Sequence, residues 1–376
     1  MSKIADNNKK NLINSLYIRN FRNHDVIELS SIGNSVVVLG CNGSGKTSIL
    51  EAISTFSNSR GLRNSKFPEM LKRDRTECLI ELELKVDDLM SHQLKSTFNK
   101  EKKSRRLFFN ENEIKSFQDF RKNISMLWLT PYTDRIFTGS SSSRRSFFDG
   151  IVINFDYSHA IRLSEYDKFL KQRSKILKDE YKDDNWINTL EDRLAKLSVA
   201  ISCSRLDILL KIKDALINPL IEFPKVEVSY HNSLENQLLE FPAIEIEEKL
   251  KKNYLESREL DRLLGGSQYG CQRSDIIVTN LNTDIMAKMS SSGEQQAILI
   301  SLIIAASKAL KKSTNFSPIL LLDEVFIHLD EIRKVALLRE IEALDSQAWI
   351  TTTEKEKFLL SKKFCYYNLY NKDIKS

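Results

Sequence analysis

Residues 40–47 read Gly-Cys-Asn-Gly-Ser-Gly-Lys-Thr, a set of residue types suited to holding a chain of phosphates. The glycines let the backbone wrap so that successive N–H groups face an anion. Lys46 would reach the β- and γ-phosphates, and the hydroxyl of Thr47 would be a ligand of Mg²⁺. The apolar residues before this loop and the helix-like residues after it complete a P-loop. The sequence therefore predicts a nucleoside triphosphate site built from Gly40, Cys41, Asn42, Gly43, Ser44, Gly45, Lys46, Thr47 and Ser48.

A second segment, residues 319–324, is an apolar run that ends in two carboxylates. Asp323 would hold Mg²⁺ through water, and Glu324 would orient and deprotonate the attacking water. Four apolar residues before Asp-Glu are a weak signal alone. In a chain that also carries a P-loop, they predict the catalytic edge of the same site.

A third segment, residues 290–295, reads Ser-Ser-Ser-Gly-Glu-Gln and opens an apolar helix. Helix N-termini bind anions, and Gly293 would allow a phosphate to approach the backbone closely. The alternative is an ordinary capping box, because Ser291 and Glu294 stand in the S-x-x-E spacing that starts many helices. Both interpretations stay open from these residues alone.

Length and composition bound the fold and the location. The chain has 376 residues, more than the roughly 250–300 at which a single core stops growing, so two or more lobes are expected. Its five cysteines are odd in number and show no C-x-x-C spacing, which argues against a disulfide framework or a zinc site. The first ten residues lack the apolar core of a signal peptide, and the apolar stretch 297–306 is too short to span a bilayer. We expect a cytoplasmic protein with no membrane segment.

The pattern along the chain changes twice between α/β and helical. Residues 77–87 alternate as a strand with one wet face, and 107–114 resemble a hairpin. From about 143 to 224 the spacing of leucines and isoleucines predicts helices, with a turn at 182–185. A charged helix over 244–264 ends at two glycines, after which strands and helices alternate again. A head domain interrupted by a helical insertion accounts for this order.

The three segments together resemble the ABC-type ATPase heads of the SMC-related DNA repair group, and within it the RecF family. Further similarities lie along nearly the whole chain, at residues 16–22, 60–63, 144–149, 258–259, 270–275, 323–330 and 351–353. The resemblance implies an α/β fold: a mixed sheet with flanking helices, a β-rich subdomain and an inserted helical arm. It implies a head in two parts, 1–142 and 266–376, separated by the arm at 143–265.

The resemblance also implies a function. Members of this family bind ATP with Mg²⁺, form ATP-dependent head-to-head homodimers, and bind double-stranded DNA and single/double-strand junctions. They work with RecR and RecO in loading RecA, in recombination, replication restart and the SOS response. On this chain Lys46, Thr47, Asp323 and Glu324 would act from one subunit, while Ser291 and Gly293 would contact the γ-phosphate held by the other. Asp330 would line that interface, and Thr351 or Thr352 would sense the γ-phosphate.

The net charge is only +6, so the distribution of basic residues matters more than their number. Two basic runs suit sequence-independent contacts to DNA phosphates, although each is equally well read as a solvated loop. The candidates are Arg60, Arg63, Arg73, Lys102, Lys103 and Arg105. A transporter-type ATPase subunit, or another SMC-like head, remains the alternative function because it would share the three segments.

Overall fold

The computed structural model describes residues 9–30, 32–57, 61–63, 65–86, 90–102, 104–114, 124–178, 184–218, 221–231, 233–353, 364–369 and 373–375. The chain divides into two compact units, and each is described here by itself. Unit 1 comprises residues 1–134, 218–224 and 291–376, and unit 2 comprises 135–217 and 225–290. Among the helices in the described ranges, none has both the length and the apolar character that a bilayer span requires.

Unit 1 is built on a six-stranded sheet in the order β17-β16-β4-β15-β14-β9. Its strands pair in parallel except for β17, which runs antiparallel to β16. The central strands carry almost unbroken apolar runs, as expected of strands covered on both faces. The bounds are β4 Ser35–Leu39, β9 Met126–Leu129, β14 Ile319–Leu322, β15 Ala348–Thr352, β16 Phe364–Asn368 and β17 Asp373–Lys375.

A second six-stranded sheet of unit 1 is wholly antiparallel, in the order β3-β2-β5-β6-β7-β8. This sheet confirms the expected β-rich subdomain. Cys78, Ile80, Leu82 and Leu84 of β5 are buried and alternate with more exposed residues, which is the predicted period of two. The bounds are β2 Leu12–Phe21, β3 His24–Leu29, β5 Glu77–Lys85, β6 Ser91–Asn99, β7 Ser104–Phe109 and β8 Asn112–Ile114.

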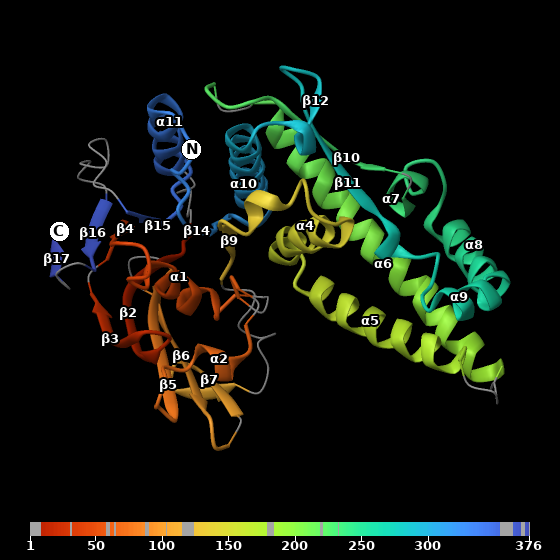
Figure 1. Ribbon diagram of the computed structural model, residues 1–376, viewed down its shortest axis with the longest axis horizontal. Coiled ribbons are helices and arrows are strands. Elements are labelled where there is room, and N and C mark those ends of the chain that lie inside the picture. The colour runs from red at the N-terminus through yellow and green to blue at the C-terminus, as the bar shows by residue number, and fades with distance from the viewer. Residues whose placement is uncertain are drawn as a thin grey trace, which may run out of the picture. The chain divides into compact units, whose positions relative to one another are not determined.

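Helices α1, α10 and α11 of unit 1 lie beside the parallel sheet (Figure 1). Helix α1, Lys46–Ser54, contacts β15 of the parallel sheet and β2 and β5 of the antiparallel one, so the two sheets share one apolar core across it. Helix α10, Ser292–Thr314, is buried over most of its middle part and packs on β9. The remaining elements are α2 Phe67–Met70, α11 Glu331–Ala343 and a short parallel pair, β1 Lys9–Lys10 with β13 Phe316–Ser317.

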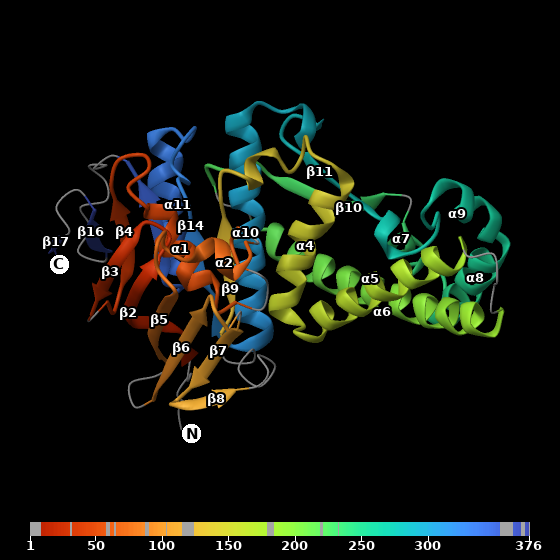
Figure 2. The same ribbon diagram turned by 60° about the horizontal axis from the view of Figure 1, so that its bottom comes forward.

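Unit 2 is mainly helical and contains the predicted arm (Figure 2). Along α6 the residues at 190, 194, 201, 208 and 212 are buried on one stripe, as the spacing predicts. Residues 179–183, which include the first half of the turn predicted at 182–185, lie outside the described residues, and the second half already belongs to α6, which begins at Asp184. The helices are α4 Ser141–Phe155, α5 Ser158–Ile176, α6 Asp184–Leu216, α7 Leu234–Gln237, α8 Ala243–Glu256 and α9 Arg258–Leu264.

The predicted single helix over 244–264 is wrong in one respect, because it breaks at Ser257 into α8 and α9. Ser257 is both the C-cap of α8 and the N-cap of α9, and its hydroxyl donates to Asp261 Oδ2 at 2.8 Å. The predicted end is confirmed: Gly265 caps α9 with a φ of 75°, a conformation that glycine adopts without strain.

Unit 2 also holds a three-stranded antiparallel sheet, β10 Val226–His231, β11 Asp275–Asn280 and β12 Ile285–Met286. The pairing of β10 with β11 runs from Val226 with Asn280 to His231 with Asp275. It ties residues 266–290 to unit 2, whereas the sequence places them with the head. The compact units therefore divide differently from the predicted ranges at this point.

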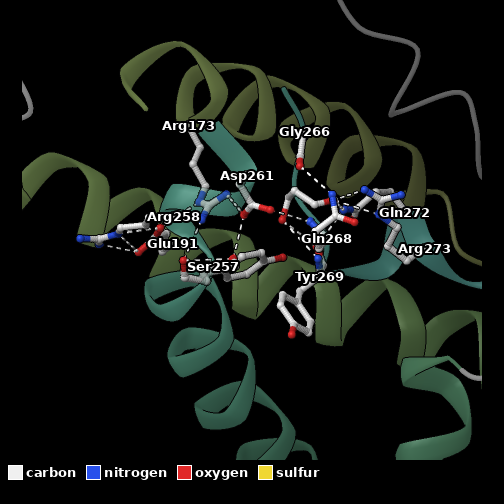
Figure 3. A network of polar contacts seen from close by, with 12 residues as sticks. Arg173, Glu191, Ser257, Arg258, Asp261, Gly266, Gln268, Tyr269, Gln272 and Arg273 are labelled. Atoms are coloured by element: carbon white, nitrogen blue, oxygen red, sulfur yellow. Dashed lines mark hydrogen bonds and ion pairs between the residues drawn. The ribbon is translucent and has the colours of Figure 1, made fainter. Parts of the chain in front are cut away.

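Charged groups are paired inside unit 2. Arg173 of α5 donates to Glu191 of α6 at 2.8 Å and to Asp261 of α9 at 2.6 Å (Figure 3). All three side chains are at most 4% exposed. Arg258 adds a second guanidinium on Glu191, at 2.6 Å, and Gln268 N donates to the free oxygen of Asp261 at 2.9 Å. These bonds join three helices, and each oxygen of the two carboxylates accepts at least one of them.

A second buried cluster of unit 2 is centred on Asp149 of α4. Arg205 of α6 bonds both carboxylate oxygens at 2.8 Å, and His159 Nε2 lies 2.9 Å from Oδ1. Burial raises the pKa of Asp149, but the charge and hydrogen bonds of Arg205 and the contact with His159 outweigh it and hold the pKa at about 2. Asp149 is therefore an anion in the folded protein at neutral pH.

Candidate nucleotide site

The P-loop occupies the turn between β4, which ends at Leu39, and α1, which begins at Lys46. Gly43 and Gly45 have φ of 82° and 97°, in the left-handed region where a side chain is strained. A Cβ at Gly45 would also overlap the side chains of Asn23 and His24. The loop is thus shaped by close packing against the turn between β2 and β3 as well as by its own glycines.

Lys46 is buried at the start of α1, with 4% of its side chain exposed. Its Nζ donates to the carbonyl oxygens of Gly40 at 2.8 Å and Cys41 at 3.2 Å, and lies 3.7 Å from Glu324 Oε1. The ammonium group is therefore held over the mouth of the loop. It can exchange these neutral carbonyl partners for phosphate oxygens, which bind a cation more strongly.

Asp323 follows β14 directly and is 5% exposed. The hydroxyl of Thr47 lies 2.9 Å from both of its carboxylate oxygens, and the hydroxyl of Thr351 lies 2.7 Å from Oδ1. The pKa of Asp323 is raised above its ordinary value, because the effect of burial outweighs the bonds from Thr351 and Thr47, which act to lower it. The two predicted ligands of Mg²⁺, one on α1 and one after β14, are brought together as the sequence requires.

Glu324, the predicted catalytic carboxylate, has a φ of 53°, which is uncommon for a residue with a side chain. Its N–H donates to Thr351 Oγ1 at 2.8 Å. Its side chain is 25% exposed and lines the same cavity as Lys46 and Thr47. The backbone therefore turns sharply after Asp323 and presents Glu324 to the cavity.

The cavity at the P-loop has a volume of about 680 Å³ and an open mouth. This is within the range of small-molecule sites, about 300–1,000 Å³. The lining comes from the β2–β3 turn, the P-loop and start of α1, the segment after α1 and the residue after Asp323: Arg22, Asn23, Gly43, Gly45, Lys46, Thr47, Ser48, Arg63, Glu69, Leu71, Lys72, Arg73 and Glu324. The five cations in this list outnumber its two carboxylates, which makes the cavity suited to a polyphosphate.

The residues present fit ATP with a divalent cation. Ser44 Oγ is buried in the loop without a hydrogen-bond partner among the described residues, and a Cβ at Gly40 would collide with that same oxygen. Within the described ranges, no three His, Cys, Asp or Glu side chains gather into a metal site of their own. Thr47 and Asp323 therefore suit Mg²⁺, which is usually held by one or two protein oxygens, substrate phosphates and water.

The third predicted segment, residues 290–295, is called the signature segment from here on. It opens α10, where Ser291 is the N-cap. Ser291 Oγ accepts from Glu294 N at 3.3 Å, and Glu294 Oε2 accepts from Ser291 N at 3.0 Å, so the capping box is formed. Gly293 lies against the turn after Glu324, since a Cβ there would come within 3.2 Å of His328 O. The lining of the P-loop cavity, as far as the structure describes it, includes neither Ser291 nor Gly293.

Asp330 and the threonines of β15 lie near this turn. Asp330 is the N-cap of α11 and accepts from Arg333 N at 2.8 Å. Thr351 and Thr352 are both buried, and Thr351 carries the bonds to Asp323 and Glu324 described above. Contacts of Ser291, Gly293 and Asp330 with a second subunit stay predictions.

The basic residues predicted to contact DNA are divided by the structure. Arg63 and Arg73 line the nucleotide cavity, and Arg63 Nη1 lies 3.6 Å from Glu51. Lys102 is exposed at the β6–β7 turn. Arg60 and Lys103 lie outside the described residues.

Arg105 faces inward. It donates to Thr55 O at 2.8 Å, and its guanidinium lies 4.3 Å from the centre of the Phe67 ring. Burial lowers its pKa to about 9. This side chain supports the fold, and we leave it out of the proposed DNA contacts.

Other side chains shape the site from outside the three motifs, and one of them, Arg22, ends the segment 16–22 that the sequence analysis compares with the family. Arg22 bonds both oxygens of the fully buried Glu51 and donates to Glu69 O at 2.6 Å, so it ties α1 to the segment that lines the cavity. His24 Nε2 lies 3.0 Å from Gly45 O. A lone histidine predicts no function, and the structure places His24 at the start of β3, directly after the turn that packs against the P-loop.

A parallel sheet with a P-loop at one strand end, a carboxylate pair at the next but one, and a serine-glycine segment opening a buried helix define an ATPase head of the ABC type. The sequence of residues 12–375 matches the protein-family model of the RecF/RecN/SMC N terminal domain. The SMC head domain of Pyrococcus furiosus, in complex with part of ScpA, has a similar fold, with a TM-score of 0.51 at 14% identity over 95% of this chain and 93% of that one.

Two curated relatives, each named "DNA replication and repair protein RecF", cover nearly the whole chain. That of Rickettsia conorii is 38% identical over 348 residues, 93% of this chain and 96% of its own length. That of Rickettsia prowazekii is 36% identical over 351 residues, 92% and 95% of the two chains. A solved structure of the recombination mediator protein RecF-ATPrS in the RecFOR pathway aligns with a TM-score of 0.85 at 26% identity, covering 97% of both chains. The chain therefore belongs to the RecF family, which decides against a transporter subunit.

Proposed function

We propose that this chain is an ATP-switched DNA-binding protein of recombinational repair and replication restart. ATP with Mg²⁺ would drive a head-to-head homodimer that closes on double-stranded DNA near single-strand gaps and junctions. Slow, DNA-stimulated hydrolysis would reopen it. With RecR and RecO it would promote loading of RecA. The names of its relatives support the pathway.

One observation supports the dimer most directly. The cavity is lined by the P-loop and by Glu324, while the signature residues Ser291 and Gly293 are absent from its described lining. Ser291 is exposed at the start of α10. A signature that does not reach the nucleotide cavity of its own chain is available to a nucleotide on a second copy. ATP would then favour the closed dimer because it adds contacts in that state only.

The chemistry would rest on residues that already face the cavity. Lys46 would neutralise charge on the β- and γ-phosphates, and Glu324 would accept a proton from the attacking water. Mg²⁺, when bound at Thr47 and Asp323, supplies charge neutralisation for the phosphates. DNA contacts would come from Arg60, Arg63, Arg73, Lys102 and Lys103, directed at phosphates and independent of sequence.

The test is the oligomeric state, measured by light scattering with ATP, with ADP and without nucleotide, in the presence and absence of duplex DNA. Glu324→Gln keeps the size of the side chain but removes its base, so we expect it to accumulate as an ATP-bound dimer that retains DNA. Glu248→Gln is the matched control, because it makes the same change at an exposed carboxylate on α8, and it should behave as wild type. A monomeric Glu324→Gln protein in saturating ATP, or one that ignores DNA at low salt, would contradict the proposal.

A further inference from the structure

Thr351 carries a pair of hydrogen bonds that the catalytic scheme above does not use. Its side chain is fully buried in β15, between β14 and β4 of the parallel sheet. The hydroxyl donates its single proton to Asp323 Oδ1 at 2.7 Å and accepts the N–H of Glu324 at 2.8 Å. One hydroxyl therefore touches both residues at the end of β14.

The sheet itself cannot supply these bonds. The paired residues of β14 and β15 end at Leu322 and Ile350. Asp323 N still donates to Leu129 O at 2.9 Å, but the chain then turns at Glu324 with a φ of 53°. An amide leaving a sheet at such a turn needs a new acceptor, since a buried N–H without a partner is costly. Thr351 Oγ1 is that acceptor.

The same hydroxyl also fixes the rotamer of Asp323. Oδ1 accepts from Thr351, and the Thr47 hydroxyl lies 2.9 Å from each oxygen. The Thr47 hydroxyl has a single proton, so even with its oxygen on Mg²⁺ it would donate to one carboxylate oxygen at a time and would not fix the rotamer by itself. Thr351 then remains to hold the carboxylate in place.

We propose that Thr351 is a positioning residue that sets the directions of Asp323 and Glu324 together, without touching the nucleotide. This inference rests on the proposed ATPase function. It assigns Thr351 a role different from sensing the γ-phosphate: the hydroxyl acts through the carboxylate of Asp323 and the backbone N–H of Glu324. Mutation of a residue that orients a metal ligand in this way typically lowers metal affinity or activity by about 10- to 100-fold.

Two pairs of variants isolate the hydroxyl. Thr351 and Thr351→Val differ by one hydroxyl at nearly constant volume, and so do Thr351→Ser and Thr351→Ala at a smaller volume. If Thr351→Val is too unstable to purify, the second pair carries the test. Thr55→Val is the matched control, because Thr55 is also buried and its hydroxyl donates only to the nearby Ala52 O.

The measurements are the thermal unfolding midpoint, the affinity for a fluorescent ATP analogue with and without Mg²⁺, and the Mg²⁺ dependence of kcat. We expect Thr351→Val and Thr351→Ala to bind the analogue without Mg²⁺ within about 2-fold of their hydroxyl-bearing partners. Their half-saturating Mg²⁺ should rise and their kcat fall by about 10-fold or more. Thr351→Ser and Thr55→Val should remain close to wild type.

Three results would overturn the inference. They are an unchanged kcat and Mg²⁺ dependence in both hydroxyl-free variants, a Thr351→Ser protein as impaired as Thr351→Ala, or hydroxyl-free variants whose ATP-analogue binding weakens as much without Mg²⁺ as with it. A wild-type protein that neither binds nor hydrolyses ATP would instead remove the proposed function, and the inference with it. The two failures are therefore distinguishable.

Discussion

The nucleotide site of unit 1 and the Arg173 network of unit 2 both bury charged side chains, but they satisfy them differently. Around Lys46 and Asp323 the hydrogen-bond partners are carbonyl and hydroxyl groups, with Glu324 Oε1 farther from Lys46 Nζ at 3.7 Å, and the cavity remains open beside them. Around Arg173, each nitrogen of the guanidinium donates to a carboxylate or a carbonyl oxygen. Neutral partners can be exchanged for a ligand, whereas paired ions hold helices together. The difference separates a site prepared for binding from one that serves the fold.

The largest effect expected from this comparison is on the stability of unit 2. Arg173→Met should lower its free energy of unfolding by about 3–5 kcal/mol, because Glu191 and Asp261 would stay buried with fewer partners. Urea unfolding followed by circular dichroism measures the change. Arg262→Met is the control, since Arg262 is exposed in a pair with Glu259, and a cost above about 1 kcal/mol there would blur the comparison.

Lys46→Met should leave unfolding nearly unchanged and weaken ATP binding by about 100-fold or more, because a charged contact to phosphate is lost from a mostly buried position. Titration of a fluorescent ATP analogue measures the affinity. Lys211→Met, in an exposed pair on α6, is the matched control. Wild-type affinity in Lys46→Met would show that the P-loop assignment is wrong.

The Asp149 cluster should show the pH response of a paired ion. Its folded pKa of about 2 lies below the ordinary 3.8, so its stabilisation, about 2 kcal/mol, is present above pH 4 and is lost as the pH falls toward 2. Between pH 5 and pH 3 about half should disappear. The unfolding free energy of Asp149→Asn should fall correspondingly less over this range, while Asp207→Asn, which changes an exposed carboxylate, should follow wild type.

The smallest effect concerns the packing of the P-loop. His24→Ala removes the contact with Gly45 O and should weaken ATP binding by about 5-fold, the equivalent of one hydrogen bond of about 1 kcal/mol. His92→Ala, on β6 beside Phe109, is the control. Equal affinities for the two variants would mean that the loop holds its shape without the β2–β3 turn.

The same contrast explains what the sequence could predict. The P-loop and the residues after β14 were readable because phosphate chemistry demands particular residue types in adjacent positions. The Arg173 network was not, because its members lie on three helices, with Arg173 and Asp261 separated by 88 positions. Nothing in the local pattern distinguishes these charges from the exposed ones on the same helices. The sequence does not predict the break at Ser257 for a related reason. A single serine inside a strong helical pattern gives no local sign of a break, and its contact with Asp261 is visible only in the structure.

The close approach of Gly293 to His328 bears on how genetic data from this family should be read. A Cβ at position 293 would come within 3.2 Å of a backbone carbonyl oxygen, in the segment that follows Glu324 of the same chain. A defective Gly293 variant would therefore report damage within its own chain, whatever it does to a contact between copies. Ser291 is exposed, but its hydroxyl caps α10 through Glu294 N, so a substitution there also changes the chain that carries it.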